Sequence, residues 1–201
     1  MAKLSTKLSA ADYVVCNLDY PSTTGSFPEM ISVLARAVDA HRASCSKIHF
    51  VAYSLGALVV RGYLGEASLP QLGRVVMIAP PNHGSQITDS LGNTRVFRKL
   101  MGPVATQLGT SPGELPQQLP SPYYPLGIIA GDRPINPLGW LLIPGAEDGS
   151  VSVASTRLDG MSDFLIVHRS HTFIMNAPEV ANQTIRFLRQ GSFEHKAALQ
   201  R

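Results

Sequence analysis

The sequence predicts an α/β protein in which an open, mostly parallel sheet is covered by helices on both faces. Short runs of β-forming residues alternate with segments of helical periodicity, which favours parallel strands joined by helical crossovers. The runs are almost continuously apolar, as is typical of a sheet buried on both sides. Because the chain has 201 residues, we expect residues 1–201 to form a single domain.

Five apolar runs are predicted as strands. In chain order they are residues 13–18, 48–52, 74–79, 128–130 and 164–167. The first run ends at the turn-forming sequence DYPS, the third at two prolines, and the fourth at a Gly-Asp pair. A sheet that follows the order of the chain needs only right-handed crossovers.

Three segments have the spacing of helices. Residues 55–64 are apolar and end at Gly65, which is a plausible helix stop, and residues 178–189 form an amphipathic segment that begins with proline. Residues 29–42 place apolar side chains about one helical turn apart, at Ile31, Leu34, Ala35 and Val38.

A long connection separates the third and fourth predicted strands. Residues 84–127 are rich in glycine and proline and contain one helical segment, residues 93–101. Connections of this length within a compact domain are usually functional or mobile. We expect a cap or lid over the site, and a surface excursion without a role is the alternative.

The composition excludes several classes of protein. A hydrophobic content of 44% with 15% charged residues argues against disorder, and a net charge of +3 without long blocks of like charge predicts no nucleic-acid partner. No apolar run approaches 18 residues, so no integral membrane segment is expected. The first ten residues resemble no signal peptide, which favours a cytoplasmic location. Two cysteines, Cys16 and Cys45, are expected to be free, buried thiols.

A serine lies at the end of the second predicted strand, in the sequence Ala52-Tyr53-Ser54-Leu55-Gly56, directly before a helix. A tight strand-to-helix turn needs small residues two positions before and after its central residue. Such a turn exposes the serine hydroxyl at a helix N-terminus, where a developing negative charge is favoured. The hydroxyl needs a histidine to accept its proton and a carboxylate to orient that histidine.

The chain supplies both groups downstream. Asp148 lies in a loop beyond the fourth predicted strand, and His171 lies just beyond the fifth. Because chemistry gathers at the carboxyl ends of parallel strands, both are expected on the same rim as Ser54. The order Ser, Asp, His is the one used by strand–turn–helix serine enzymes.

Other roles and other residues remain open for the nucleophile and the acid. Ser54 could serve only as a helix N-cap. The rivals of Asp148 are Asp132, which also follows a strand end, and Glu147 and Asp163.

The base also has rivals. His168 competes with His171 but lies at a strand terminus, where a side-chain hydrogen bond would explain it. His83 is expected to line the rim or order a loop. The three remaining histidines have no supporting context: His41, His49 and His195.

Four segments resemble bacterial esterases and lipases of the α/β-hydrolase superfamily. Residues 49–64 (HFVAYSLGALVVRGYL) and 74–85 (RVVMIAPPNHGS) are similar to the region around their nucleophile. Residues 147–155 (EDGSVSVAS) and 170–175 (SHTFIM) are similar to their acid and histidine loops. The resemblance covers residues 8–193 and implies the α/β-hydrolase fold.

The resemblance implies that Ser54, Asp148 and His171 are nucleophile, acid and base. It also implies that the backbone N–H of Leu55 is one of two donors to the oxyanion. The chain departs from the family at Ala52, where most members have glycine, and we interpret this alanine as a tolerated small residue.

The chain lacks the family's strand and His-Gly type loop that supply the second oxyanion donor, so the fold is reduced at its N-terminus. One lost donor costs on the order of 3 kcal/mol. A truncated start, direct pairing of residues 13–18 with residues 48–52, or a second subunit would each account for this. We favour direct pairing, with a replacement donor in residues 19–26, and we also expect some homo-oligomerisation.

The implied activity is hydrolysis of carboxylic esters through an acyl-enzyme, without cofactor or metal, on short to medium acyl esters. Two alternatives remain: a catalytically impaired remnant that serves as an interaction domain, and a thioesterase, amidase or haloperoxidase with the same triad. The side chains expected to bind the small-molecule ester are apolar or aromatic: Tyr53, Leu55, Met101, Leu108, Tyr123, Tyr124, Trp140, Leu141, Leu142, Phe173 and Met175.

Overall fold

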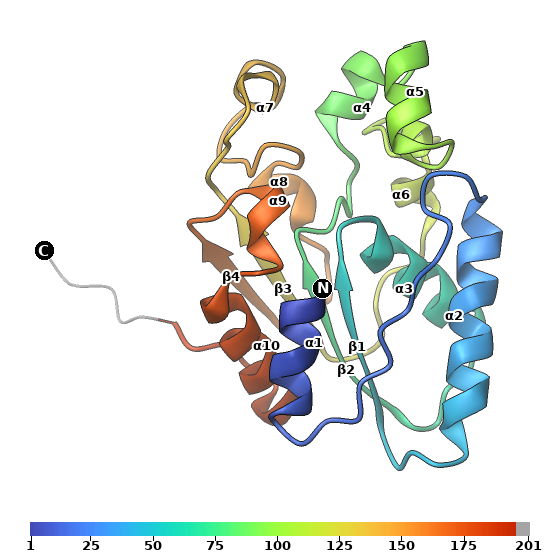
Figure 1. The fold of residues 1–201 in the computed structure, drawn as a ribbon. Helices are drawn as coiled ribbons and strands as arrows, with labels where there is room; N and C mark the ends of the chain where they lie inside the picture. Colours follow the sequence, from blue (N-terminus) through green and yellow to red (C-terminus); the bar gives the residue numbers. More distant parts are fainter. Residues whose placement is uncertain (196–201) are drawn as a thin grey trace, which may run out of the picture.

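A four-stranded parallel sheet forms the centre of the molecule in the computed structural model, which describes residues 1–195 apart from the side chain of Leu138 (Figure 1). The strands are β1 (Ile48–Tyr53), β2 (Leu72–Ile78), β3 (Leu126–Gly131) and β4 (Asp163–Val167). They lie in the order β1-β2-β3-β4, and each neighbouring pair is parallel. The predicted α/β class with a parallel sheet is confirmed.

Helices cover both faces of the sheet, as predicted. Helices α2 (Phe27–Arg42) and α3 (Leu55–Glu66) pack together on one face, and α1 (Ala2–Ser9) and α10 (Pro178–Gln190) pack together on the other (Figure 1). The sequence predicted α2, α3 and α10 to within two residues at each end, but it did not predict α1. None of the helices in residues 1–195 is long and apolar enough to cross a membrane.

The strands divide their side chains between two buried clusters. In β2, Val75 and Met77 join the cluster under α2 and α3, whereas Val76 and Ile78 join the cluster under α1 and α10. All four side chains are fully buried. Side chains alternate between the faces of a strand, so a strand covered on both sides must be apolar throughout.

Helix α2 begins at a capping box. The Ser26 side chain accepts a hydrogen bond from the Glu29 N–H, and the Glu29 carboxylate accepts one from the Ser26 N–H at 2.6 Å. Two N–H groups that the helix cannot pair internally are thereby satisfied. The sequence placed the start of this helix at Glu29, two residues late.

The predicted strand at residues 13–18 is wrong. Tyr13 and Val15 pack against the cluster under α1 and α10, and Leu18 packs against the cluster under α2 and α3, but the segment pairs with no strand within residues 1–195. Direct pairing with β1 is therefore also wrong. The apolar run was read as a buried strand, but a strand also needs a hydrogen-bonded neighbour, and this segment has none within residues 1–195. Val14 in this segment is 94% exposed.

The cysteines differ from the expectation in their burial. Both are free thiols, but Cys16 is exposed and Cys45 is half-buried. Cys16 lies in the unpaired segment that follows α1, and the burial predicted for it depended on a strand that does not form.

The connection between β2 and β3 carries four short helices rather than the one that the sequence predicted. Two of them, α4 and α5, lie beyond the carboxyl ends of the strands (Figure 1). A role for this connection as a cap stays a prediction. Its helices are α4 (Gln86–Leu91), α5 (Arg95–Met101), η1 (Ala105–Gln107) and α6 (Leu115–Gln118).

Arg61 joins α3 to both ends of this connection. Its guanidinium donates to the Asn82 carbonyl at 3.2 Å and to the carbonyls of Leu119 at 2.9 Å and Pro120 at 3.3 Å. The residue is 3% exposed, and burial lowers the pKa of the guanidinium to about 10. The Asn82 carbonyl in particular depends on Arg61, because Asn82 is fully buried and a buried acceptor without a donor is costly.

We predict that Arg61→Met lowers the free energy of unfolding by about 1–3 kcal/mol, since it leaves buried carbonyls without donors. Urea denaturation measures this change. Arg36→Met is the matched control, because Arg36 is exposed on α2, and it should have little effect. Equal stability of the two variants would contradict the structural role of Arg61.

Candidate active site

Ser54 occupies the sharp turn between β1 and α3. Its backbone has φ 51° and ψ −125°, a left-handed conformation that is unusual for a residue with a side chain. The Ser54 N–H donates to the Ile78 carbonyl at 2.9 Å, so β2 holds the turn in place. Such strain persists only where the surrounding structure enforces it, and it is concentrated at functional sites.

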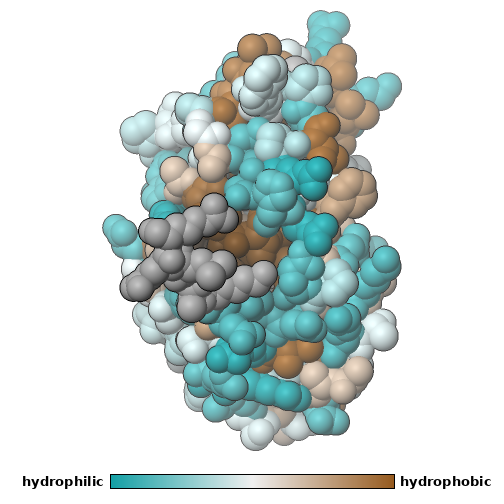
Figure 2. All heavy atoms as spheres, turned by 90° about the vertical axis from the view of Figure 1, so that its left-hand side faces the viewer, coloured by the Kyte–Doolittle hydropathy of each residue, from teal (hydrophilic) through white to brown (hydrophobic). Residues whose placement is uncertain are grey.

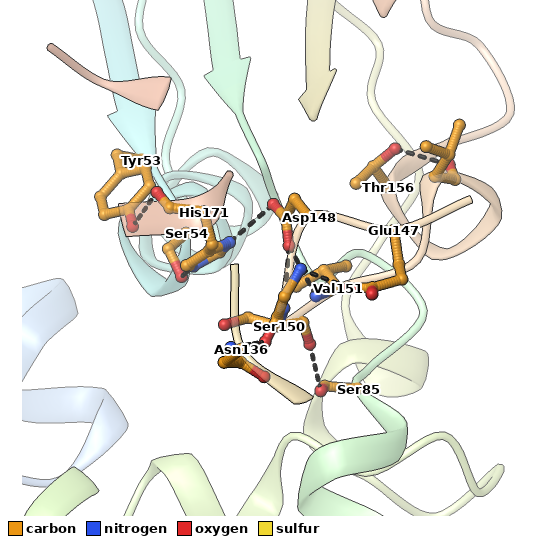
Figure 3. Close-up of polar contacts among 12 residues, drawn as sticks. Tyr53, Ser54, Ser85, Asn136, Glu147, Asp148, Ser150, Val151, Thr156 and His171 are labelled. Carbon is orange, nitrogen blue, oxygen red and sulfur yellow. Dashed lines mark hydrogen bonds and ion pairs between the residues drawn. The ribbon is translucent and has the colours of Figure 1, made fainter. Parts of the chain in front are cut away.

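The structure brings Ser54, His171 and Asp148 into one hydrogen-bonded chain (Figure 3). Ser54 Oγ lies 2.9 Å from His171 Nε2, and His171 Nδ1 lies 2.8 Å from Asp148 Oδ2. His171 begins the short helix α9 (His171–Ile174), just beyond β4. The three loops meet because parallel strands direct their carboxyl ends to the same edge.

Tyr53 contacts both the backbone and the ring of His171. Its hydroxyl donates to the His171 carbonyl at 2.8 Å, and the centroids of the two rings are 5.1 Å apart. Burial, aided by the charge of Asp148, raises the pKa of Tyr53, so its hydroxyl remains a donor at neutral pH. The sequence analysis expected Tyr53 to bind substrate, whereas the structure shows it holding the backbone of His171.

The carboxylate of Asp148 is fixed by backbone donors. Its Oδ1 accepts the N–H groups of Ser150 at 3.0 Å and Val151 at 2.9 Å, and the residue is only 1% exposed. Gly149, which lies between Asp148 and Ser150, has φ 102°, a conformation that favours glycine. Asn136 donates from its side-chain amide to the Gly149 carbonyl at 2.9 Å and so supports this turn.

The loop that carries Asp148, the acid loop, is also hydrogen-bonded to the connection between β2 and β3. The Ser85 hydroxyl donates to the Ser150 carbonyl, and the Ser155 hydroxyl donates to the Gly84 carbonyl, each at 2.5 Å (Figure 3 labels Ser85 and Ser150). Above these contacts, α4 touches α7 (Pro137–Leu142). The start of the predicted cap therefore rests on the loop that carries Asp148.

The rivals of Asp148 lie in other surroundings. Asp132 pairs with His168 at 2.9 Å, where the histidine side chain is 72% exposed. Asp163 begins β4, at the opposite end of the sheet from Ser54, and pairs with His195 at 2.8 Å. Neither of these two carboxylates contacts His171.

The rivals of His171 are likewise engaged elsewhere. His83 lies 3.4 Å from the Gln117 side chain. His49 accepts the Arg74 N–H at 2.9 Å, and burial lowers the pKa of its imidazole.

The residues predicted to bind the ester are divided by the structure. Met101 on α5, Trp140 on α7 and Phe173 on α9 are exposed at the carboxyl end of the sheet. Tyr123 and Tyr124 come directly before β3 and therefore lie at the amino end, away from Ser54. Of the remaining candidates, Leu108 is buried in the core, Leu141 is exposed, and three are half-buried: Leu55, Leu142 and Met175.

A cavity of about 420 Å³ lies beside the acid loop. It is lined by Asp132, Pro134 and residues 140–147, and neither Ser54 nor His171 contributes to it. Figure 2 shows this side of the molecule as largely hydrophilic, with hydrophobic patches toward the end at which α7 lies. Trp140, Leu141 and Leu142 thus line a hollow beside the loop that carries Asp148, and Ser54 does not contribute to it.

The first turn of α3 offers free donors beside Ser54. The N–H groups of Leu55 and Gly56 have no backbone acceptor within residues 1–195. Unpaired N–H groups at the N-terminus of a helix favour a negative charge beside them.

The part of the chain that the structure describes contains no group of three or more His, Cys, Asp or Glu side chains able to hold a metal ion.

Two solved proteins whose structures resemble this chain are a lipase and a phospholipase. The mature lipase BlEst2 of Bacillus licheniformis is 18% identical, with a TM-score of 0.62, and the match covers 86% of this chain and 76% of that one. Phospholipase PlaB of Legionella pneumophila is 16% identical, with a TM-score of 0.69, and the match covers 94% of this chain and 56% of that one. These likenesses show the fold, which is that of α/β-hydrolases. No protein-family model and no curated protein matches the sequence.

Sequence reasoning missed two supports of the acid loop. Asn136 directly precedes a proline at the start of α7, and an Asn-Pro pair is a recognisable helix start that would have drawn attention to it. Ser85 carried no such signal for its contact, because the carbonyl of Ser150 lies 65 residues away in the chain.

Glu147, beside Asp148, is a buried carboxyl group that does not reach the histidine. It is 2% exposed, its Oε2 accepts the Gly149 N–H, and its Oε1 has no partner. Burial raises the pKa of Glu147, and the charge of Asp148 raises it further, against the effect of the Gly149 N–H. The folded state therefore binds this proton more tightly than the unfolded state does.

We predict that this group stabilises the fold at acid pH and that its contribution is lost as pH rises through the raised pKa. Glu147→Gln cannot ionise, so its stability relative to the wild type should improve from pH 4 to pH 7. Urea denaturation at both pH values measures the change. Glu66→Gln, at an exposed position of α3, should show no such trend, and an equal trend in both variants would refute the prediction.

Proposed function

We propose that this chain is a serine carboxylic ester hydrolase in which Ser54 is the nucleophile, His171 the base and Asp148 the acid. One observation carries the proposal. A serine in a strained strand-to-helix turn lies 2.9 Å from an imidazole nitrogen, and the other nitrogen lies 2.8 Å from a buried carboxylate. These distances are within the hydrogen-bond reach that such a relay needs.

The first half of the reaction forms an acyl-enzyme. Ser54 Oγ attacks the ester carbonyl carbon while His171 Nε2 takes the serine proton. The carbonyl oxygen becomes an oxyanion, which the Leu55 N–H stabilises. When the tetrahedral intermediate collapses, the carbon–oxygen bond to the alcohol breaks, and His171 returns the proton to the departing oxygen.

The second half releases the acid. Water replaces the alcohol and gives a proton to His171, and the resulting hydroxide attacks the acyl carbon. Collapse of the second intermediate breaks the bond to Ser54 Oγ, which recovers its proton. Asp148 holds the imidazole in the tautomer with Nδ1 protonated and stabilises its cationic form. Apart from the ester and water, every group in this proposed cycle belongs to the chain, so the mechanism needs no cofactor.

The surroundings of the site favour an ester with an apolar acyl group. Met101, Trp140 and Phe173 present exposed apolar surface at this end of the molecule, and exposed apolar patches commonly mark binding sites. The short helices of residues 84–127 leave a modest cap, which suits short to medium acyl chains. The likeness to a lipase and a phospholipase supports the reaction class but not the choice of acyl chain.

We predict that Ser54→Ala lowers the rate of p-nitrophenyl butyrate hydrolysis by about 10³-fold or more, because it removes the nucleophile. Ser32→Ala is the matched control, since Ser32 lies on the exposed surface of α2. A fluorophosphonate should add its mass to the wild type and to Ser32→Ala but not to Ser54→Ala. Equal rates for wild type and Ser54→Ala would refute the proposed function, and a preference for thioesters or amides would reassign it within the same mechanism.

We predict that Asp148→Asn lowers kcat by about 10⁴-fold, since an amide favours the wrong imidazole tautomer. Asp132→Asn tests the main rival, which also lies beside a histidine, and should retain activity close to that of the wild type. Steady-state kinetics on the same ester measure both variants. A larger loss in Asp132→Asn than in Asp148→Asn would show that Asp132, and not Asp148, is the acid.

A further inference from the structure

Tyr20 brings a phenol to the turn that carries Ser54. A Cβ built on Gly56 would lie 3.0 Å from the Tyr20 hydroxyl and 3.9 Å from the Ala52 side chain. The hydroxyl is therefore in contact with the first turn of α3, two residues after Ser54. A side chain at position 56 would be in tight contact with this hydroxyl.

The loop around Tyr20 is well fixed. The Tyr20 carbonyl accepts the Ser22 N–H at 2.7 Å, and the Pro21 carbonyl accepts the Gly25 N–H at 2.8 Å. Gly102, at the end of α5, packs directly against Thr23. The Tyr20 ring also packs against the core cluster under α2 and α3. The position of the hydroxyl thus follows from a folded turn rather than from a free side chain.

The hydroxyl of Tyr20 is a donor in need of an acceptor. It has no hydrogen-bond partner within residues 1–195, although the residue is half-buried. Burial raises the pKa of the phenol, so the group keeps its proton at neutral pH. A partly buried hydroxyl usually finds a partner, and a ligand can supply one.

The proposed reaction creates such an acceptor. The oxyanion forms next to Ser54, and serine hydrolases stabilise it with more than one donor. On the backbone side, the first turn of α3 offers the N–H of Leu55. The hydroxyl of Tyr20 contacts the neighbouring residue, Gly56, on the same turn. Within residues 1–195, the Tyr20 hydroxyl is therefore a side-chain donor without a partner that lies against this turn.

We propose that the Tyr20 hydroxyl is the second oxyanion donor, acting with the backbone N–H of Leu55. The inference rests on the proposed function. No bond of Tyr20 is made or broken: its O–H donates to the oxygen as negative charge develops on it and releases that oxygen when the carbonyl reforms. Because the charge exists only along the reaction path, the interaction favours the transition state over the bound ester.

The test is Tyr20→Phe, which removes the hydroxyl and keeps the ring. We expect kcat for p-nitrophenyl butyrate to fall by about 10²-fold with KM little changed, because one oxyanion donor is lost. A trifluoromethyl ketone, which binds serine as an oxyanion, should bind more weakly by a similar factor. The melting temperature should stay close to that of the wild type.

Tyr63→Phe is the matched control. Tyr63 is a buried tyrosine of the same core cluster, near the far end of α3. It should leave kcat unchanged. Fluorotyrosine at position 20 adds a measure that simple packing would not affect: its more acidic phenol should change kcat and ketone affinity together, whereas fluorotyrosine at position 63 should change neither.

The outcomes separate the two proposals. If Ser54→Ala is inactive but Tyr20→Phe keeps kcat and ketone affinity within about threefold of the wild type, the role of Tyr20 is overturned and the serine mechanism stands. If Ser54→Ala is as active as the wild type, both proposals fall. Equal losses in Tyr20→Phe and Tyr63→Phe, with lower melting temperatures in both, would reduce Tyr20 to a packing residue and also overturn the inference.

Discussion

The hydrogen bond between Ser54 and His171 joins two residues that are 117 positions apart in the chain, and the site depends on it. Nothing local holds these side chains together. Their meeting requires β1 and β4, the two outer strands, to keep their register through β2 and β3. The conformation of Ser54 also depends on the sheet, because β2 accepts its N–H through the carbonyl of Ile78. A shift in the register of these strands would therefore separate Ser54 from His171 even if the sheet still formed.

The site has a rigid side and an exposed side. On the rigid side, the Asp148 carboxylate accepts two backbone N–H groups and its loop is braced by Asn136, so the proposed mechanism would need little movement there when charge develops on the imidazole. On the exposed side, Trp140 and Phe173 lie open to solvent on short helices. Binding and catalytic residues are often found on loops positioned by a rigid scaffold, so this division is consistent with the function proposed above.

The sequence predicted the parts that depend on local pattern. Four apolar runs became strands in chain order, and the positions of Ser54, Asp148 and His171 after such runs placed them at one edge of the sheet. Residues 13–18 misled because a run of β-forming apolar residues does not specify a partner for its backbone. The contact of Tyr20 with Gly56 was equally hidden, since spacing along a chain does not reveal which turns touch.

Arg61 has a consequence for motion. The carbonyls that it binds, Asn82 on one side and Leu119 and Pro120 on the other, are the two ends of the connection between β2 and β3. Both ends are therefore anchored to the helix that follows Ser54. Local unfolding of the four short helices between them need not disturb Ser54. Amide hydrogen exchange would then divide the chain sharply, with fast exchange between the anchors and slow exchange at the anchors and in α3.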